Sequence, residues 1–294
     1  MGYLITMNET NNTTPDLSSF DFIVINTSAG KDSQAMMDYV VRLAEAAGVN
    51  VRERVIAVHC DLGQVEWQGT RELAEEQCKR YGIELHVVSR TKGDLLQQVE
   101  ERGMWPDNKN RYCTSDQKRD QVAKLHTSIT SQKIAEMAAR AWRQTPDSPI
   151  GKPRQIRILN CMGLRAEESP ARAKKVAYTE NKRQTNGKRL VMDWLPIHEW
   201  STKQVWDTIK ASGVPYHHAY DKGMPRLSCM FCIFAPKDAL VIAGRANPAL
   251  LDEYVRVEAK IGHTFRNGFK IAEVLDDVNA GIRPKMVESW ACSY

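Results

Sequence analysis

The residues best suited to chemistry lie close together near the start of the chain, in the run S-A-G-K-D-S at positions 28–33. Small residues let a backbone approach a ligand closely, while serine hydroxyls and the Lys31 ammonium can bind phosphate oxygens. Asp32 would repel a phosphate unless a divalent cation joins the two, so the run predicts a nucleotide bound with Mg²⁺. An ordinary strand-to-helix turn with a capping serine is the alternative. The predicted nucleotide-binding residues of this loop are Ser28, Ala29, Gly30, Lys31, Asp32 and Ser33.

Two further turns carry polar residues that could reach the same ligand. Asp61 and Gly63 follow one predicted strand, and Gly163 and Arg165 follow another. An arginine at the end of a strand can make the two parallel hydrogen bonds that phosphate geometry favours. The alternatives are a plain turn at Asp61 and Gly63, and a surface ion pair between Arg165 and Glu168.

Cysteines provide the second chemical signal. Cys229 and Cys232 have C-x-x-C spacing, which suits a metal ion or a redox dithiol. The chain has no second C-x-x-C, so a zinc site made of four cysteines is not expected. Cys113 stands at a predicted helix start near Arg111 and Lys118, which should lower the pKa of its thiol. A metal-free thiol pair and a small buried residue at position 113 are the alternatives.

These residues need a scaffold that brings them together. Short apolar runs rich in β-branched residues predict strands, and helical spacing of apolar residues predicts helices between them. This alternation implies an α/β fold with a Rossmann-like parallel sheet and helices on both faces. Ligands of such sheets bind at the carboxyl ends of the strands, where the loop at 28–33 and the turn at 59–63 lie. Strands are predicted at 22–27, 54–60, 83–88 and 156–162, and helices at 31–47, 66–81, 92–102, 128–143, 201–212, 236–246, 248–261 and 271–279.

The chain divides into three predicted parts. Residues 1–19 are polar, rich in Asn and Thr, and expected to form a flexible arm. Residues 20–235 are expected to form the α/β nucleotide-binding domain, and residues 236–294 a helical extension packed on it. The stretch 145–153 holds three prolines and is expected to be a linker or surface loop.

Composition limits the classes of protein. The 294 residues suffice for one large α/β domain with an appendage, and a formal net charge of +5 is too small to indicate a nucleic-acid partner by itself. No apolar run is long enough for a membrane span, and the first residues lack the basic-then-apolar order of a signal peptide. Seven scattered cysteines are not typical of a secreted disulfide scaffold, so we expect a cytoplasmic protein without membrane contact.

Positive charge is concentrated between residues 165 and 189. Eight Lys or Arg residues stand against three Glu in this stretch. It could form a mobile flap over an anionic substrate, a surface that contacts nucleic-acid phosphates, or a solvated charged loop. The sequence leaves these three interpretations open.

The run at 28–33 resembles S-G-G-x-D-S, the pyrophosphate loop of the N-type ATP pyrophosphatases and the related sulfonucleotide reductases. Ala29 replaces the first glycine of that pattern, and the spacing differs from the G-x-x-x-x-G-K-[ST] phosphate loop. The resemblance covers roughly residues 22–234 and implies the adenine nucleotide α-hydrolase fold. It also implies that Asp61 and Gly63 line the nucleoside pocket and that Arg165 contacts phosphate.

The same resemblance assigns a role to the cysteines. In the family, a cysteine at a helix start joins a later C-x-x-C pair to hold an iron–sulfur cluster, which implies Cys113, Cys229 and Cys232 as ligands here. The fourth position would be open or filled by Cys161, a histidine or sulfide. One difference is that Tyr112 stands where some members have a second cysteine.

In type, the chain is most similar to the ATP pyrophosphatase component of DNA phosphorothioation systems. This resemblance implies cleavage of ATP to AMP and pyrophosphate, activation of an acceptor such as the DNA backbone, and sulfur supplied by a cysteine desulfurase. Lys31 and Arg165 would offset charge on the phosphates, and Asp32 would position Mg²⁺. A homodimer is one form that such an enzyme could take.

Two alternatives remain for the function. A phosphoadenylyl-sulfate or adenylyl-sulfate reductase would produce sulfite, but the thioredoxin-dependent ones carry a C-terminal E-C-G-L-H, and this context is absent around Cys292. A nucleotide-binding subunit without catalysis is the second alternative, and the charged residues of the loop at 28–33 argue against it.

Overall fold

The computed structural model describes residues 14–144 and 154–287 of the chain. The first part of the predicted N-terminal arm, the predicted loop at 145–153 and Cys292 therefore lie outside the described residues. The end of the arm is docked on the domain, because Leu17–Ser19 form a short 3₁₀-helix (η1) and the Leu17 side chain is buried in the core.

A six-stranded sheet forms the centre of the molecule, in the order β3-β2-β1-β4-β6-β5. All neighbouring strands pair in parallel except β5, which runs antiparallel to β6 at one edge. The four predicted strands and the parallel sheet are therefore confirmed, with β5 as the exception. The strands are β1 (Phe22–Thr27), β2 (Val55–Cys60), β3 (Glu84–Val88), β4 (Ile156–Cys161), β5 (Tyr178–Glu180) and β6 (Arg189–Trp194).

β5 and β6 were not predicted, and they lie within and after the basic stretch at 165–189. β5 has three residues, and β6 mixes charged with apolar residues, so neither gives the apolar run that identifies the other strands. Three arginines of the stretch, Arg165, Arg172 and Arg189, are buried. Parts of the stretch therefore belong to the core, whereas other basic residues, such as Lys174 and Lys182, are exposed.

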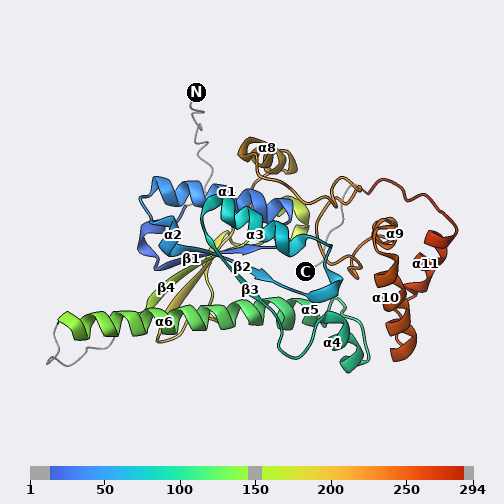
Figure 1. Ribbon diagram of the computed structural model, residues 1–294, viewed down its shortest axis with the longest axis horizontal. Helices are drawn as coiled ribbons and strands as arrows, with labels where there is room; N and C mark the ends of the chain where they lie inside the picture. Colours follow the sequence, from blue (N-terminus) through green and yellow to red (C-terminus); the bar gives the residue numbers. More distant parts are fainter. Residues whose placement is uncertain (1–13, 145–153, 288–294) are drawn as a thin grey trace.

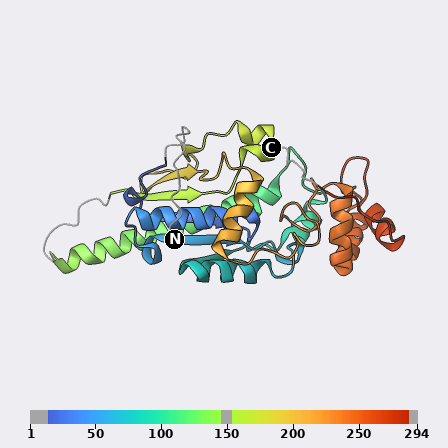
Figure 2. The ribbon, with the colours of Figure 1, turned by 90° about the horizontal axis from the view of Figure 1, so that it is seen from above.

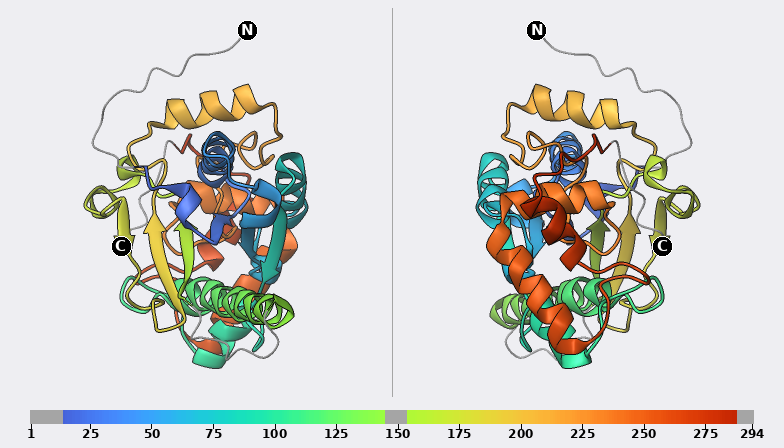
Figure 3. Two further views of the ribbon diagram at one scale, coloured as in Figure 1. Left: turned by 90° about the vertical axis from the view of Figure 1, so that its left-hand side faces the viewer. Right: turned by 90° about the vertical axis from the view of Figure 1, so that its right-hand side faces the viewer.

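Helices cover both faces of the sheet, as predicted (Figure 1). α1, α3 and α8 lie on one face and α6 on the other, as the view along the sheet shows (Figure 3). Because successive side chains of a strand point to opposite faces, Ile23 and Ile25 pack with α1 and Val24 packs with α6. These helices are α1 (Lys31–Ala46), α3 (Thr70–Tyr81), α6 (Asp120–Gln144) and α8 (Thr202–Ser212), and α2 (Val51–Arg54) leads into β2.

Helix boundaries differ most from the prediction at three places. The helix predicted at 92–102 begins at Leu95, because Asp94 and Gln97 form a capping box there. α3 begins later than predicted because Gly69, at φ +82°, separates it from a 3₁₀ turn. α6 begins earlier because it continues directly from a π-helical turn. The capping box of Ser201 and Gln204 at the start of α8 is confirmed. The short segments are η2 (Gly63–Val65), α5 (Tyr112–Thr114), the π-helical η3 (Ser115–Arg119), η4 (Ala166–Glu168) and α7 (Pro170–Ala173).

The C-terminal helices form a group at one end of the molecule (Figure 2). They share a core with α4 (Leu95–Arg102), and Tyr254 of α10 stacks on Trp105 with ring centroids 5.3 Å apart and 13° between the planes. Among the helices of the described ranges, none is both long and apolar enough to span a membrane. The helices of this group are α9 (Lys237–Ala246), α10 (Pro248–Ile261) and α11 (Ala272–Asn279).

Candidate active site

The loop at 28–33 turns from the end of β1 into the first turn of α1. Gly30 is the N-cap residue of α1 and has no side chain with which to cap the helix. The Ser33 hydroxyl donates to the Gly30 carbonyl (2.9 Å) and accepts from the Ser28 N–H (3.2 Å), which closes the loop around the helix start. Ala29 has φ +53°, a left-handed conformation that costs a residue other than glycine about 1–2 kcal/mol. This conformation explains the glycine of the related pattern.

The first turn of α1 is suited to bind an anion. Its N–H groups have no acceptor within the helix, and the helix dipole adds a partial positive charge at this end. The Lys31 N–H donates to the hydroxyl of Tyr220 (2.7 Å), which comes from the segment after α8. The Lys31 ammonium also lies 5.8 Å from the centre of the Tyr220 ring. Phosphate is favoured at such a helix start.

Asp32 is held between two cations. Its Oδ2 accepts from the Lys31 ammonium (3.1 Å), and its Oδ1 accepts from Nε of Arg165 (2.6 Å). Burial alone raises the pKa of the Asp32 carboxyl, but the two cations outweigh burial and hold the pKa below its ordinary value. The carboxylate is therefore ionised at neutral pH and fixed in direction.

Arg165 lies beneath the loop, and its side chain is 3% exposed. The guanidinium does not form the ion pair with Glu168 that was the alternative interpretation, because Glu168 accepts the backbone N–H of Arg165 instead (3.1 Å). The guanidinium binds Asp32 and does not line the cavity. The sequence predicted that it would contact phosphate directly. The acceptors of the guanidinium are Asp32 (2.6 Å), Glu167 (2.7 Å), the Trp200 carbonyl (3.1 Å) and the Thr202 hydroxyl (3.2 Å).

Gly163 brings the turn after β4 against the same helix start. A Cβ atom at this position would lie 3.0 Å from the backbone carbon and oxygen of Asp32 and 3.1 Å from the backbone nitrogen of Ser33. A residue with a side chain could not approach α1 this closely without displacement. Glycine is therefore needed here for the packing of two elements of the site.

A cavity of about 880 Å³ lies at the carboxyl ends of the strands. Its walls are the turns after β1, β2 and β4, the start of α6, and the segment that holds the C-x-x-C pair. This volume suits a nucleotide-sized ligand. The predicted site residues that line it are Ser28, Gly30, Asp32, Ser33, Cys113, Gly163, Cys229 and Cys232. Those that do not line it are Ala29, Lys31, Asp61, Gly63 and Arg165.

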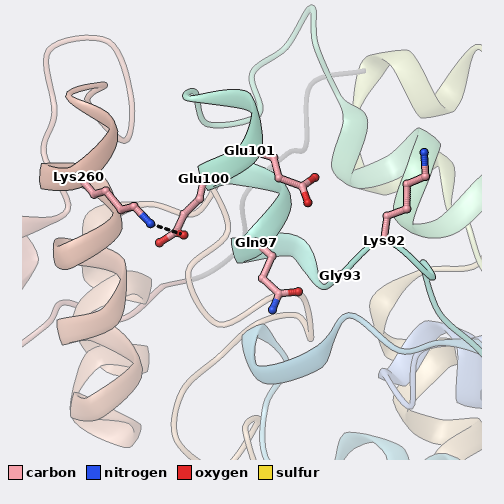
Figure 4. A pocket seen from close by; sticks show the side chains of 6 residues that line it. All are labelled: Lys92, Gly93, Gln97, Glu100, Glu101 and Lys260. Carbon is pink, nitrogen blue, oxygen red and sulfur yellow. Dashed lines mark hydrogen bonds and ion pairs between the residues drawn. The ribbon is translucent and has the colours of Figure 1, made fainter.

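A second depression, between α4 and α10, is a poorer candidate for the site (Figure 4). Lys260 pairs with Glu100 there (2.8 Å), so charges on its wall neutralise each other. None of the predicted site residues lines it. Its lining residues are Lys92, Gly93, Gln97, Glu100, Glu101 and Lys260.

Asp61 and Gly63 shape the turn after β2. The Asp61 carboxylate accepts from the Gly63 N–H (2.8 Å), and Gly63 has φ +75°. A Cβ atom at Gly63 would lie 2.8 Å from Cβ of Asp94, so the turn also requires glycine for close packing. Leu62 and Glu66 of the same turn reach the cavity in place of the two predicted residues.

Comparison with known proteins assigns the chain to a family. The family model for the phosphoadenosine phosphosulfate reductase domain matches residues 22–235. The chain belongs to this family.

Individual relatives of this phosphoadenosine phosphosulfate (PAPS) reductase-family chain are distant. An uncharacterized 37.8 kDa protein of Escherichia phage 186 is 26% identical over 166 residues, which make up 56% of this chain and 42% of the relative. The adenosine 5'-phosphosulfate reductase of Shouchella clausii is 31% identical over 103 residues, which make up 31% of this chain and 39% of that enzyme. The chain therefore spans less than half the length of these curated relatives.

Two solved structures illustrate how far the structural similarity extends. The PAPS reductase of Candida auris has 15% sequence identity and a TM-score of 0.39, and the match covers 72% of this chain and 83% of that chain. The U34-tRNA thiolase of Methanococcus maripaludis, solved with its [4Fe-4S] cluster, has 12% identity and a TM-score of 0.40 over 90% of this chain and 74% of that chain. Similarity at this level carries no argument about the reaction.

The predicted cluster ligands of this PAPS reductase-family chain share one cavity but do not form a metal site. Cys113, Cys229 and Cys232 all line the cavity. Across residues 14–144 and 154–287, however, no group of three or more His, Cys, Asp or Glu side chains is arranged to hold a metal ion. Cys161 as a fourth ligand is wrong, because its side chain is fully buried on the α1 face of β4. The residues as placed do not fit a cluster.

A lysine lies among these thiols. Burial lowers the pKa of the Lys118 ammonium. Its interactions with nearby groups outweigh burial and raise the pKa above its ordinary value; these groups are Cys229, Cys113, Cys60 and Glu66. Burial raises the pKa of the Cys229 thiol to about 11, although Lys118 lowers it in part. This end of the PAPS reductase-family site therefore combines several sulfur atoms with one ammonium group.

A row of hydrogen-bonded Asn and Asp side chains in the cavity was not predicted from the sequence. Asn26 donates to Asn160 (2.7 Å), Asn160 donates to Asp193 (2.7 Å), and Asn181 also donates to Asp193 (3.1 Å). Asn26, Asn160 and Asp193 stand near the ends of β1, β4 and β6, where a polar residue interrupts an apolar strand. That interruption is the signal that could have identified them.

The cavity is also electropositive, because seven basic side chains line it against four acidic ones. His59 and Tyr220 line it too and were not predicted, since single residues of these types form no motif. The basic residues are Arg111, Lys118, Arg119, Arg172, Lys175, Arg183 and Arg226, and the acidic ones are Asp32, Glu66, Glu168 and Asp193.

Proposed function

We propose that this PAPS reductase-family chain is an ATP pyrophosphatase, which converts ATP to AMP and pyrophosphate and so activates an acceptor for sulfur incorporation. The observation that carries the proposal is the start of α1. There the loop at 28–33, a helix N-terminus with glycine as its N-cap residue and a fixed Asp32 carboxylate meet at a basic cavity. Phosphates of ATP match this combination of donors and charge.

The residues of the chain would act on the phosphates through position and charge. The N–H groups of the α1 turn and the hydroxyls of Ser28 and Ser33 would bind phosphate oxygens. The Lys31 ammonium now donates to the Pro225 carbonyl (3.0 Å) and to Asp32 (3.1 Å). Exchange of that carbonyl for a phosphate oxygen would place the ammonium where charge develops as pyrophosphate leaves. Arg165 would keep Asp32, and through it Lys31, in position.

Magnesium belongs to this proposal as part of the substrate, bound to ATP. Both oxygens of Asp32 are already engaged, one by Lys31 and one by Arg165. A direct bond between Asp32 and Mg²⁺ therefore stays a prediction. When bound to the nucleotide, Mg²⁺ neutralises phosphate charge, and no proposed step depends on a bond between Mg²⁺ and Asp32.

The cysteines enter the proposal as side chains that handle sulfur. Cys113, Cys229 and Cys232 lie in the same cavity as the proposed phosphate site. A cysteine desulfurase is the proposed sulfur donor, and it would deliver sulfur to this end of the cavity. Because the arrangement does not fit a cluster, no step is routed through iron.

The proposed acceptor is nucleic acid, with DNA as the first candidate. Arg119, Lys175 and Arg183 are exposed and line the cavity, and the exposed Lys174 and Lys182 are their neighbours in sequence. Backbone phosphates fit such a basic rim. Binding of a DNA duplex should therefore weaken steeply with added salt, and salt-independent binding would contradict a phosphate-contacting rim.

Release of pyrophosphate from ATP tests the function. The full chain would be incubated with ATP and Mg²⁺, with and without DNA and a cysteine desulfurase. We expect Lys31→Ala and Asp32→Ala each to reduce release by about a hundredfold or more. Lys92→Ala, which changes an exposed lysine in the second depression, is the matched control and should retain activity. Full activity in both loop variants would exclude the proposal.

The same assay separates the two alternatives. Sulfite formed from phosphoadenylyl sulfate or adenylyl sulfate without any need for ATP would select a reductase. Tight ATP binding without pyrophosphate release under all conditions would select a non-catalytic nucleotide-binding subunit.

A further inference from the structure

His59 lies in the wall of the cavity beside the loop at 28–33, and the proposed reaction does not use it. It is 1% exposed and stands next to Thr27 in the register of β2 and β1. Nδ1 of His59 is 3.2 Å from the Thr27 carbonyl oxygen, and Nε2 is 3.2 Å from Oε2 of Glu66. All three residues line the cavity.

Both partners of the His59 ring can only accept hydrogen bonds. A carbonyl oxygen carries no proton, and neither does an ionised carboxylate. A neutral imidazole has a single N–H, so one of the two contacts would then bring two lone pairs together. Two donated hydrogen bonds require a proton on each ring nitrogen. The geometry thus calls for the charged ring.

We propose that His59 is an imidazolium in the native protein and a positioning residue for the phosphate loop. Its Nδ1–H holds the carbonyl of Thr27, the last residue of β1, while the Thr27 hydroxyl accepts from the Ala29 N–H (3.2 Å). The ring therefore fixes the point from which the loop turns toward α1. In one respect this rests on the proposed function, namely that the loop binds a nucleotide.

The charged groups around the ring determine whether the pKa of His59 is raised or lowered. Burial lowers the pKa of His59, but contact with Glu66, the Thr27 carbonyl and the charge of Asp61 raise it more, so the pKa lies above the ordinary value of 6.5. From the other elements, Lys118 before α6 interacts with Glu66, and Arg71 of α3 is 4.0 Å from Asp61.

The sign of the pH dependence follows from this raised pKa. The stabilisation by the protonated ring is fully present below 6.5, the ordinary value, and is lost as the pH rises through the pKa of the folded protein. Loss of the proton removes one of the two hydrogen bonds, so the attachment of Thr27 weakens. Nucleotide affinity should weaken over the same pH range.

The protonation state can be tested without a nucleotide. An NMR titration of the ¹⁵N-labelled full chain should show both ring nitrogens of His59 protonated at neutral pH. In Glu66→Gln, which keeps the size but removes the charge, the midpoint for His59 should fall by about 1 pH unit or more. Glu84→Gln is the matched control, because Glu84 lies 3.4 Å from a different, partly exposed histidine, His86. A single protonated nitrogen in wild-type His59 at neutral pH would overturn the proposal, even if the variant failed to fold.

ATP binding tests the positioning role. Calorimetric affinity of the full chain for ATP should fall by up to about tenfold per pH unit above the pKa of His59, the limit for loss of one proton. Glu66→Gln should move this profile to lower pH. An affinity loss that is equal at every pH would indicate a merely structural role for Glu66 and overturn the proposal. If ATP bound at no pH although both nitrogens were protonated, the proposed nucleotide function would be the part that fails.

Discussion

At the scale of single residues, Arg165 shows how a buried arginine can hold a carboxylate of the candidate site in place without lining the cavity itself. Its planar guanidinium donates through separate N–H groups to Asp32, Glu167 and Thr202. A lysine would supply the charge, but it has no rigid fork to reach several acceptors at once. The function of Arg165 therefore depends on shape as well as charge.

We expect Arg165→Lys to destabilise the protein by about 1–3 kcal/mol, because buried acceptors lose their donors. Pyrophosphate release should fall as well, since Asp32 is no longer held. Urea unfolding and the ATP assay would measure the two effects. The control is Arg256→Lys, because Arg256 is exposed on α10, does not line the cavity and makes a surface ion pair with Glu253 (2.6 Å). Equal stability and activity of the two variants would contradict the role given to Arg165.

At the scale of elements, the unit of β1, loop and α1 was predictable because local sequence determines it. Small residues mark the turn, and apolar spacing marks the strand and the helix. β5 and β6 depend on pairing at the edge of a sheet that is built from distant segments. No local pattern in their charged sequence encodes that pairing.

The same distinction applies to the candidate site. The loop at 28–33 was predictable, whereas the position of the C-x-x-C segment depends on contacts distant in sequence. The Met230 N–H, for example, donates to the Val65 carbonyl (2.9 Å) and ties the segment to the turn after β2. His59 and Tyr220 depend on such contacts too, so sequence spacing could not identify them.

Gly163→Ala tests the close approach of the β4 turn to α1. The added methyl group would lie 3.0 Å from the Asp32 backbone, so one of the two elements must move. We expect destabilisation by about 1–3 kcal/mol and an affinity for ATP reduced by about tenfold or more. The matched control is Gly187→Ala, since nothing lies within 4 Å of a Cβ atom at Gly187. Unchanged ATP affinity in Gly163→Ala would rule out this requirement.

At the scale of the whole molecule, the cavity is built jointly by the sheet and the C-terminal helical group. Phe231 and Tyr254 line it, and Tyr254 also stacks on Trp105. One hydrophobic core runs from Leu62 to Val274. This core contains residues from both sides of residue 235, where the sequence analysis placed the boundary between the α/β domain and the helical extension.

A chain that ends at residue 235 should consequently fail to fold to a soluble, cooperative state. Within the full chain, Tyr254→Ala should destabilise by about 3–5 kcal/mol, whereas Tyr254→Phe keeps the ring and should cost little. Soluble yield and urea unfolding would provide the measurements. A shortened chain with the stability of the full one would show that residues 20–235 form an independent domain.

The hydroxyl of Tyr220 has a further consequence for how the empty protein behaves. It accepts from the N–H groups of Lys31 and Leu227, and so occupies a place that suits a phosphate oxygen. The phenol hydroxyl therefore satisfies N–H groups at the helix start while no nucleotide is bound. An arriving phosphate would have to displace it, and Cys229 follows Tyr220 by nine residues along the chain. Binding of a phosphate at the proposed site would therefore require Tyr220 to move, together with the start of the segment that leads to the thiols.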